Sequence, residues 1–102
     1  MKKTKICAVQ FRVYPNFNKN IARVESFFKK ANKSNCEIIC FPEVFLTGGL
    51  YKKRYNPQMP IQSKKTFSYL SKKYSIYSIM GSVIKKINSN FYNISYLFDD
   101  KG

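Results

Sequence analysis

Residues 37–46 have the sequence Glu-Ile-Ile-Cys-Phe-Pro-Glu-Val-Phe-Leu. In it, the short apolar run of residues 38–42 leads directly to the carboxylate of Glu43. A run of β-branched and apolar residues of this length predicts a buried strand. Pro42 cannot donate a hydrogen bond to a central ladder, so the strand is expected to end before it. Glu43 would then lie at the carboxyl end of a strand, where α/β layers place their active sites.

The residues before this run predict the first half of a βαβ unit. Residues 5–11 contain mainly apolar side chains with little polar interruption, which suits a strand buried on both faces. Asn18 is a plausible N-cap for a helix that follows, because apolar residues then recur at helical spacing, at Ile21, Val24, Phe28 and Ala31. Residues 32–35 end this helix. The order of strand, amphipathic helix and strand predicts parallel strands.

The second half of the sequence predicts one more helix and two more strands. A loop over residues 47–57 precedes a helix from about Ser63 to Tyr74, with Phe67 and Leu70 on one face. Residues 76–84 are expected to form a third strand that contains Gly81 and Ser82, and residues 91–98 a fourth. The polar residues 88–90 between them predict a hairpin, and residues 99–102 a turn. The whole chain of 102 residues therefore predicts one α/β unit in the order β-α-β-α-β-β.

The strongly basic charge of the chain raises the possibility of nucleic-acid binding. The formal net charge is +14, but the lysines are dispersed as pairs along the chain and form no single basic block. Lys, Asn, Ile, Tyr and Phe, which all have AT-rich codons, make up half of the sequence, so base composition explains much of the lysine excess. Polyanion binding is therefore only a lesser alternative.

The cysteines and the N-terminus indicate a cytoplasmic protein. Cys7, Cys36 and Cys40 are odd in number and have no small-domain spacing, which argues against a disulfide framework and predicts structural roles in a reducing compartment. The residues after Met1 provide no apolar core for a signal peptide, and no window approaches the ~20 apolar residues of a membrane span.

Glu43 is the strongest catalytic candidate. The chain has no histidine, which excludes a Ser-His-Asp triad, a Cys-His dyad and histidine-ligated metal sites within these residues. It also lacks a glycine-rich phosphate motif, so no cofactor or metal is expected. The apolar neighbours of Glu43 would raise its pKa by desolvation and make it a competent base. The alternative is a turn glutamate that points into solvent.

Four ordered segments together resemble the beginning of nitrilase-superfamily enzymes, which are carbon-nitrogen hydrolases. The resemblance rests on residues 5–11, on residues 38–48 with their Phe-Pro-Glu sequence, on Ile-Met-Gly-Ser at residues 79–82, and on Tyr-Asn-Ile-Ser at residues 92–95 with the turn after it. It implies the N-terminal part of an αββα sandwich, incomplete in these residues. It also implies hydrolysis of the non-peptide C–N bonds of small amides, nitriles or carbamoyl compounds by a cytoplasmic enzyme that forms a homo-oligomer.

The resemblance assigns roles to three residue types, of which one is matched here. In such enzymes a Glu activates a Cys nucleophile, and a Lys stabilises the tetrahedral intermediate; Glu43 matches the Glu. The positions of the Lys and the Cys would follow residue 102, so residues 1–102 are expected to be a partial domain that is inactive alone. The alternative from another class is a non-catalytic module that pairs its incomplete sheet with a complementary chain.

Overall fold

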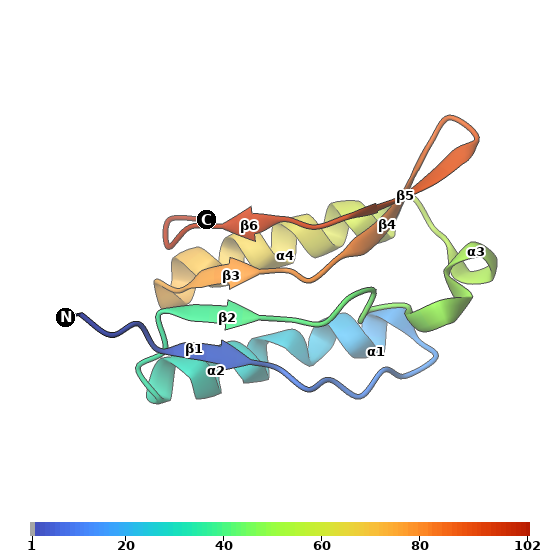
Figure 1. Cartoon of the computed structure of the whole chain (residues 1–102). Coiled ribbons are helices and arrows are strands. Elements are labelled where there is room, and N and C mark those ends of the chain that lie inside the picture. Colours follow the sequence, from blue (N-terminus) through green and yellow to red (C-terminus); the bar gives the residue numbers. More distant parts are fainter. Residues whose placement is uncertain (1) are drawn as a thin grey trace.

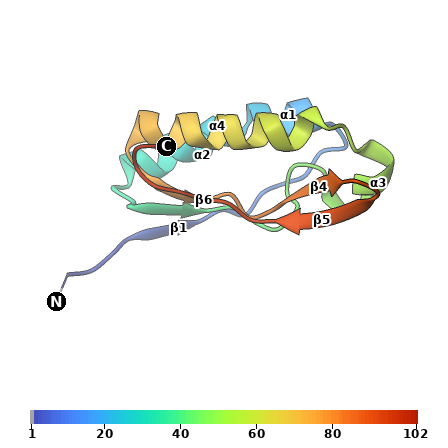
Figure 2. The same ribbon diagram turned by 90° about the horizontal axis from the view of Figure 1, so that it is seen from above.

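The computed structural model describes residues 2–102, which form a layer of helices on one face of a sheet (Figures 1 and 2). The elements in chain order are β1 (Ile6–Ala8), α1 (Phe17–Ala22), α2 (Val24–Lys33), β2 (Ile38–Cys40), the 3-10 turn η1 (Gly48–Leu50), α3 (Tyr51–Arg54), α4 (Gln58–Tyr74), β3 (Tyr77–Ile79), β4 (Val83–Ile87), β5 (Asn90–Ile94) and β6 (Leu97–Phe98). Among residues 2–102, none of the helices combines the length and the apolar character that crossing a bilayer requires.

The main sheet has the strand order β1-β2-β3-β6. β1 pairs with β2 and β2 with β3 in parallel, which confirms the parallel strands predicted from the βαβ pattern. β6 returns antiparallel to β3. A separate two-stranded sheet, the β4–β5 hairpin, extends away from the main body (Figure 1). Its turn confirms the hairpin predicted at residues 88–90.

The two predicted C-terminal strands are each divided in two. Residues 76–84 form β3 and the start of β4 in different sheets, because Gly81 has a φ of 78° and turns the chain between them. Residues 91–98 similarly divide into β5 and β6, so that one predicted strand serves both sheets. The prediction of continuous strands was therefore wrong at these two points. The loop predicted over residues 47–57 also contains η1 and α3, whereas the order of the other elements was right.

The predicted helix boundaries also change. The first helix begins with Asn16 as its N-cap, whose side chain accepts a hydrogen bond from the backbone of Lys19, so the choice of Asn18 was wrong. It is interrupted at Arg23, which ends α1 and precedes α2. The second helix starts at Gln58, five residues before the predicted Ser63, and accommodates Pro60 in its first turn, where a proline removes no internal hydrogen bond.

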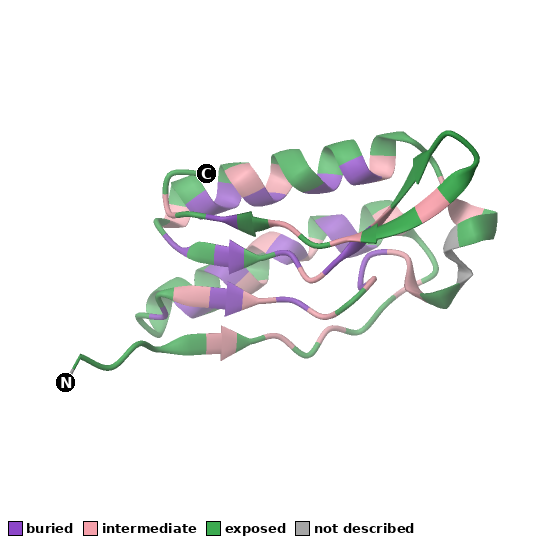
Figure 3. Cartoon of the chain, turned by 45° about the horizontal axis from the view of Figure 1, so that its top comes forward, coloured by how far each residue is buried: buried purple, intermediate pink, exposed green. Residues whose placement is uncertain are grey.

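The core lies between the helices and one face of the sheet (Figure 3). Successive strand residues point to opposite faces, so one registered row faces the helices: Cys7, Ile39, Ser78 and Phe98. Above this row, Phe28, Phe41 and Phe67 pack ring against ring, with centroids 4.9–5.9 Å apart. The helices are thus held to the sheet chiefly by buried aromatic side chains.

The opposite face of the sheet has no second layer among residues 2–102. Large apolar side chains are exposed there, with Ile6 at 58% and Leu97 at 69% of their full exposure. The prediction that the first strand is buried on both faces was therefore wrong for β1. The physical reason is that these residues supply helices for one face only (Figure 2).

A charged cluster on the helical layer connects α2 with α4. The Glu25 carboxylate accepts hydrogen bonds from Lys73 Nζ and from the Tyr74 hydroxyl, both at 2.7 Å. Both hydrogen bonds lower the pKa of Glu25, and the one from Lys73 has the larger effect. The same carboxylate raises the pKa of Lys73 and that of Tyr74, because it stabilises their protonated forms.

Candidate active site

Glu43 lies just beyond the carboxyl end of β2, as the sequence predicted. The extended chain continues past Cys40 through Phe41, whose N–H donates to the Ile79 carbonyl at 3.0 Å. After Pro42 the backbone turns, and Val44 adopts a left-handed conformation with a φ of 47°. The turn begins at Glu43, so this side chain stands at the point where the strand becomes a loop.

The surroundings of Glu43 differ from the apolar pocket that the sequence suggested. Its neighbours Phe41, Phe45 and Leu46 are buried at 5%, 1% and 1% exposure, but Glu43 itself is exposed. Because those apolar side chains point into the core, the turn directs Glu43 away from it. The expected desolvation by its sequence neighbours is therefore wrong for residues 2–102, and the carboxylate points into solvent as in the alternative interpretation.

Asn93 provides the polar contact of Glu43. Its Nδ2 donates a hydrogen bond to Glu43 Oε1 at 2.6 Å, across a separation of 50 residues. Asn93 comes from β5, so the hairpin brings a donor to the end of β2. In the sequence, Asn93 was noted only as part of residues 92–95, one of the four segments that resemble the family. An asparagine in a strand gave no local signal of this contact.

The backbone on both sides of Glu43 is held by the connection between β3 and β4. The Val44 N–H donates to Ser82 Oγ at 3.0 Å. Gly81 lies so close that an added Cβ would stand 2.1 Å from the Pro42 carbonyl oxygen and 2.6 Å from that of Phe41. Only a residue without a side chain allows this approach, and Gly81 also has a positive φ. The loop that carries Glu43 is therefore packed directly against a neighbouring backbone.

Asn20 fixes the same loop from the other side. Its side chain is fully buried and donates to the carbonyl of Tyr14 and to that of Leu46, each at 2.8 Å. Its Oδ1 accepts from the Tyr14 N–H at 2.8 Å. One carboxamide thus joins the loop after β1 to the loop after β2. The sequence shows only an asparagine within a predicted helix. It does not reveal whether that side chain is buried between two loops or exposed to solvent.

The lysines closest in sequence to the family's expected position do not reach Glu43. Lys85 and Lys86 lie on β4 and are exposed, and Lys101 lies in the C-terminal turn. Within residues 2–102 the Glu43 carboxylate forms no ion pair with a lysine. The only ion pair in this part of the chain joins Lys73 to Glu25. Residues 2–102 also contain no group of three or more His, Cys, Asp or Glu that could hold a metal ion.

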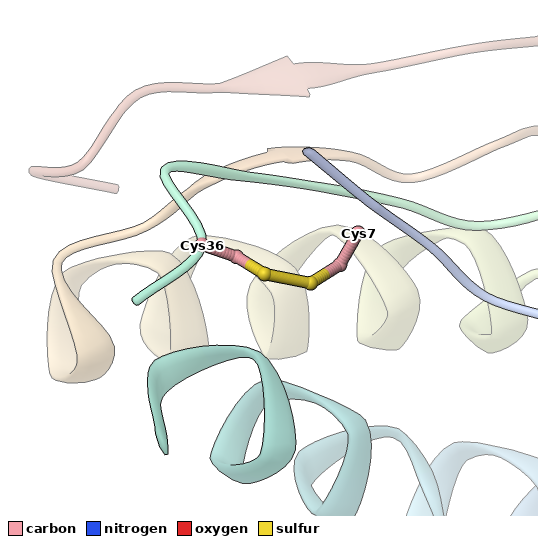
Figure 4. The surroundings of a disulfide bond; sticks show 2 residues. All are labelled: Cys7 and Cys36. Atoms are coloured by element: carbon pink, nitrogen blue, oxygen red, sulfur yellow. A yellow bond between two sulfur atoms is a disulfide. The ribbon is translucent and has the colours of Figure 1, made fainter. Parts of the chain in front are cut away.

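Two of the three cysteines are paired, contrary to the sequence-based expectation. Cys7 of β1 and Cys36, just before β2, form a disulfide with Cα atoms 6.1 Å apart (Figure 4). Their separation of 29 residues gave no recognisable spacing, and parallel pairing of β1 with β2 brings them together. Cys40 remains a free thiol and is half-buried. Within residues 2–102, none of the three forms a hydrogen bond with the Glu43 carboxylate.

Comparisons with known proteins agree with the sequence resemblance. The carbon-nitrogen hydrolase family matches residues 5–102. The chain is 30% identical over 104 aligned positions to an omega-amidase NIT2-B of Xenopus laevis, covering 100% of this chain and 38% of that protein. It is 27% identical to the human omega-amidase NIT2, with the same coverage. The chain therefore spans less than half of the length of these relatives.

Solved structures show the same fold. An amidase of Nesterenkonia sp. AN1 superimposes with a TM-score of 0.86 at 12% identity, covering 97% of this chain and 40% of that one. Nit3 of Saccharomyces cerevisiae, a member of the nitrilase superfamily, superimposes with a TM-score of 0.84 at 24% identity and covers 97% and 41%. The predicted fold class, the N-terminal portion of a nitrilase-type α/β fold, is confirmed. The chain belongs to the carbon-nitrogen hydrolase family.

Proposed function

We propose that this chain supplies the general base, Glu43, of an amidase-type carbon-nitrogen hydrolase. The observation that carries the proposal is the position of Glu43 at the carboxyl end of β2, on a loop held by Ser82 and Asn20 and with its carboxylate hydrogen-bonded to Asn93. Membership of the family and the amidase names of its relatives support an amide substrate. The exposure of the carboxylate leaves it accessible to groups outside residues 2–102.

The chemistry follows from the role of a base next to a thiol. Glu43 accepts the proton of a cysteine thiol, and the thiolate attacks the carbonyl carbon of a small amide. A lysine ammonium stabilises the oxyanion of the tetrahedral intermediate. The C–N bond then breaks, the amine leaves with a proton returned by the glutamate, and water hydrolyses the thioester. The Cys and the Lys belong to the portion of the family domain that these residues do not match.

The experiment replaces Glu43 in the complete gene product and measures ammonia release from the monoamide of a small dicarboxylic acid. We expect Glu43→Gln to lower kcat by about 100- to 10,000-fold, the usual contribution of a general base. Glu37→Gln is the matched control, because Glu37 is exposed and precedes β2 at its opposite end. Full activity of the Glu43→Gln variant would overturn the proposal.

Residues 1–102 as a separate polypeptide should release no ammonia. They contain the proposed base, but within the described residues 2–102 no cysteine or lysine forms a hydrogen bond or an ion pair with Glu43. Turnover by this polypeptide that depends on Glu43 would contradict the three-residue mechanism. The intact enzyme would form a homo-oligomer, as the family resemblance implies, and its mass in solution tests that part of the proposal.

A further inference from the structure

The hydrogen bond between Asn93 and Glu43 distinguishes the two oxygens of the carboxylate. A carboxylate only accepts, so the Asn93 amide nitrogen must be the donor, and it binds Oε1 at 2.6 Å. Within residues 2–102, Oε2 has no hydrogen-bond partner. One oxygen is thus held by the protein while the other stays free.

Glu43 and Asn93 are both positioned from the first residues of β4. Asn93 of β5 pairs with Ile84 of β4. Ser82, which directly precedes β4, accepts the hydrogen bond from Val44, the residue after Glu43. Residues 82–84 thus hold both the backbone next to Glu43 and the backbone of Asn93, so the relative position of the two residues depends on a short stretch of chain.

The far end of the hairpin is anchored as well. The Lys86 N–H donates to the Tyr55 hydroxyl at 2.9 Å. The Tyr55 ring packs edge to face on Phe91, with centroids 5.4 Å apart. These contacts join the hairpin to the segment between α3 and α4, so β5 does not swing freely and Asn93 stays in reach of Glu43.

We propose that Asn93 is a positioning residue for the catalytic base and that Oε2 of Glu43 is the oxygen that takes the thiol proton. The inference rests on the proposed role of Glu43. By holding Oε1, the amide limits rotation of the carboxylate and fixes the direction in which Oε2 points. A charge-assisted hydrogen bond of this kind is stronger than a neutral one, so a single contact is sufficient for orientation.

The kinetic test compares two asparagines of the same strand in the complete enzyme. Asn93→Ala should lower kcat by about 10- to 100-fold with KM nearly unchanged, because the lost contact orients a base and does not bind substrate. Asn90→Ala is the matched control: Asn90 is also exposed, lies on β5 and has no side-chain hydrogen bond among residues 2–102. It should leave kcat unchanged.

A pH profile separates positioning from a structural role. Asn93→Asp has the same shape but can donate only when its carboxyl group is protonated. Its kcat relative to that of the unchanged enzyme should therefore rise as the pH falls. A merely structural defect would give a ratio that does not depend on pH.

A spectroscopic test needs no activity and uses residues 1–102 as they are. The side-chain NH2 resonances of Asn93 should shift in Glu43→Gln, whereas those of Asn90 should not. If Glu43→Gln keeps full turnover, the proposed function fails. If Glu43→Gln is inactive but Asn93→Ala behaves like Asn90→Ala, or the Asn93 resonances do not respond to Glu43, the positioning role alone is wrong.

Discussion

At the scale of single residues, two asparagines define how the Glu43 loop is held, and the sequence identified neither role. Asn20 is buried between two loops, and Asn93 is exposed on a strand. Asn20 reaches Leu46, 26 residues away, and Asn93 reaches Glu43, 50 residues away. Local patterns predicted Glu43 correctly as a strand-end residue because that depends on its immediate neighbours. Long-range hydrogen bonds depend on the packing of whole elements, which spacing along the chain does not reveal.

Replacing Asn20 should destabilise the protein substantially. Asn20→Ala leaves the N–H and carbonyl of Tyr14 and the carbonyl of Leu46 without their partner. Unpaired buried polar groups are costly, so we expect a loss of about 2–4 kcal/mol in the free energy of unfolding. Urea denaturation measures it. Asn18→Ala, on the exposed side of the same helix, serves as the control, and an equal loss there would contradict the role of Asn20.

The Glu25 cluster should make stability depend on pH. Hydrogen bonds from Lys73 and Tyr74 lower the folded-state pKa of Glu25 below its ordinary value of 4.5. A lowered folded pKa means that the stabilisation is fully present above the unfolded value and is lost as the pH falls through the folded one. Glu25→Gln should thus be less stable than the unchanged chain at neutral pH.

This difference should disappear in acid. We expect the urea midpoints of Glu25→Gln and the unchanged chain to converge as the pH falls through the lowered folded-state pKa of Glu25, because below it the carboxyl group is protonated in both states. Glu37→Gln, which removes an exposed carboxylate without a side-chain partner among residues 2–102, should show no such convergence. A Glu25→Gln difference that is constant with pH would show that the ionised carboxylate is not the source of the stabilisation.

At the scale of elements, the order of helices and strands was predictable, but their interruptions were not. Apolar periodicity continues through Arg23 and through residues 76–84, so it does not show where one element becomes two. The division at Gly81 depends on the backbone of Pro42, which lies just after the neighbouring strand β2. The Cys7–Cys36 disulfide likewise results from the pairing of β1 with β2. Each of these features is set by a neighbouring element.

Gly81 should tolerate no side chain. Gly81→Ala would place a Cβ at 2.1 Å from the Pro42 carbonyl oxygen and would strain a φ of 78°. We expect a loss of about 2–4 kcal/mol in stability and a changed Asn93 side-chain NH2 signal, since the Glu43 loop must move. Gly49→Ala is the control, because its Cβ would meet no atom within 4 Å. Calorimetry and NMR that find the two variants alike would refute this packing.

At the scale of the whole molecule, the sheet has one finished and one open face (Figure 3). Ile6, Tyr77, Ile79 and Leu97 expose 58%, 43%, 37% and 69% of their surface on the side without helices. Contiguous exposed apolar surface of this kind favours association. The sequence predicted an incomplete sandwich through its resemblance to a family. The apolar pattern of the strands alone suggested burial on both faces and could not show which face lacks a cover.

The polypeptide of residues 1–102 should therefore self-associate through this face. Sedimentation velocity should show association that increases with concentration and also with salt, because salt screens the repulsion between chains of net charge +14. Ile6→Lys with Leu97→Lys should restore the monomer. Ile61→Lys with Tyr69→Lys, which changes exposed residues of α4, is the control. A chain that stays monomeric at every concentration would contradict the prediction.

The strand order β1-β2-β3-β6 has a consequence for how the protein is made on the ribosome. Each strand of this sheet lies beside the preceding strand of the same sheet, and none is inserted between two that have already paired. Once residue 40 has emerged, β1 and β2 can pair with α2 against them, and the later strands extend this sheet in the order of translation. β1 is thus the starting template, and these four strands can assemble in the order in which they are translated.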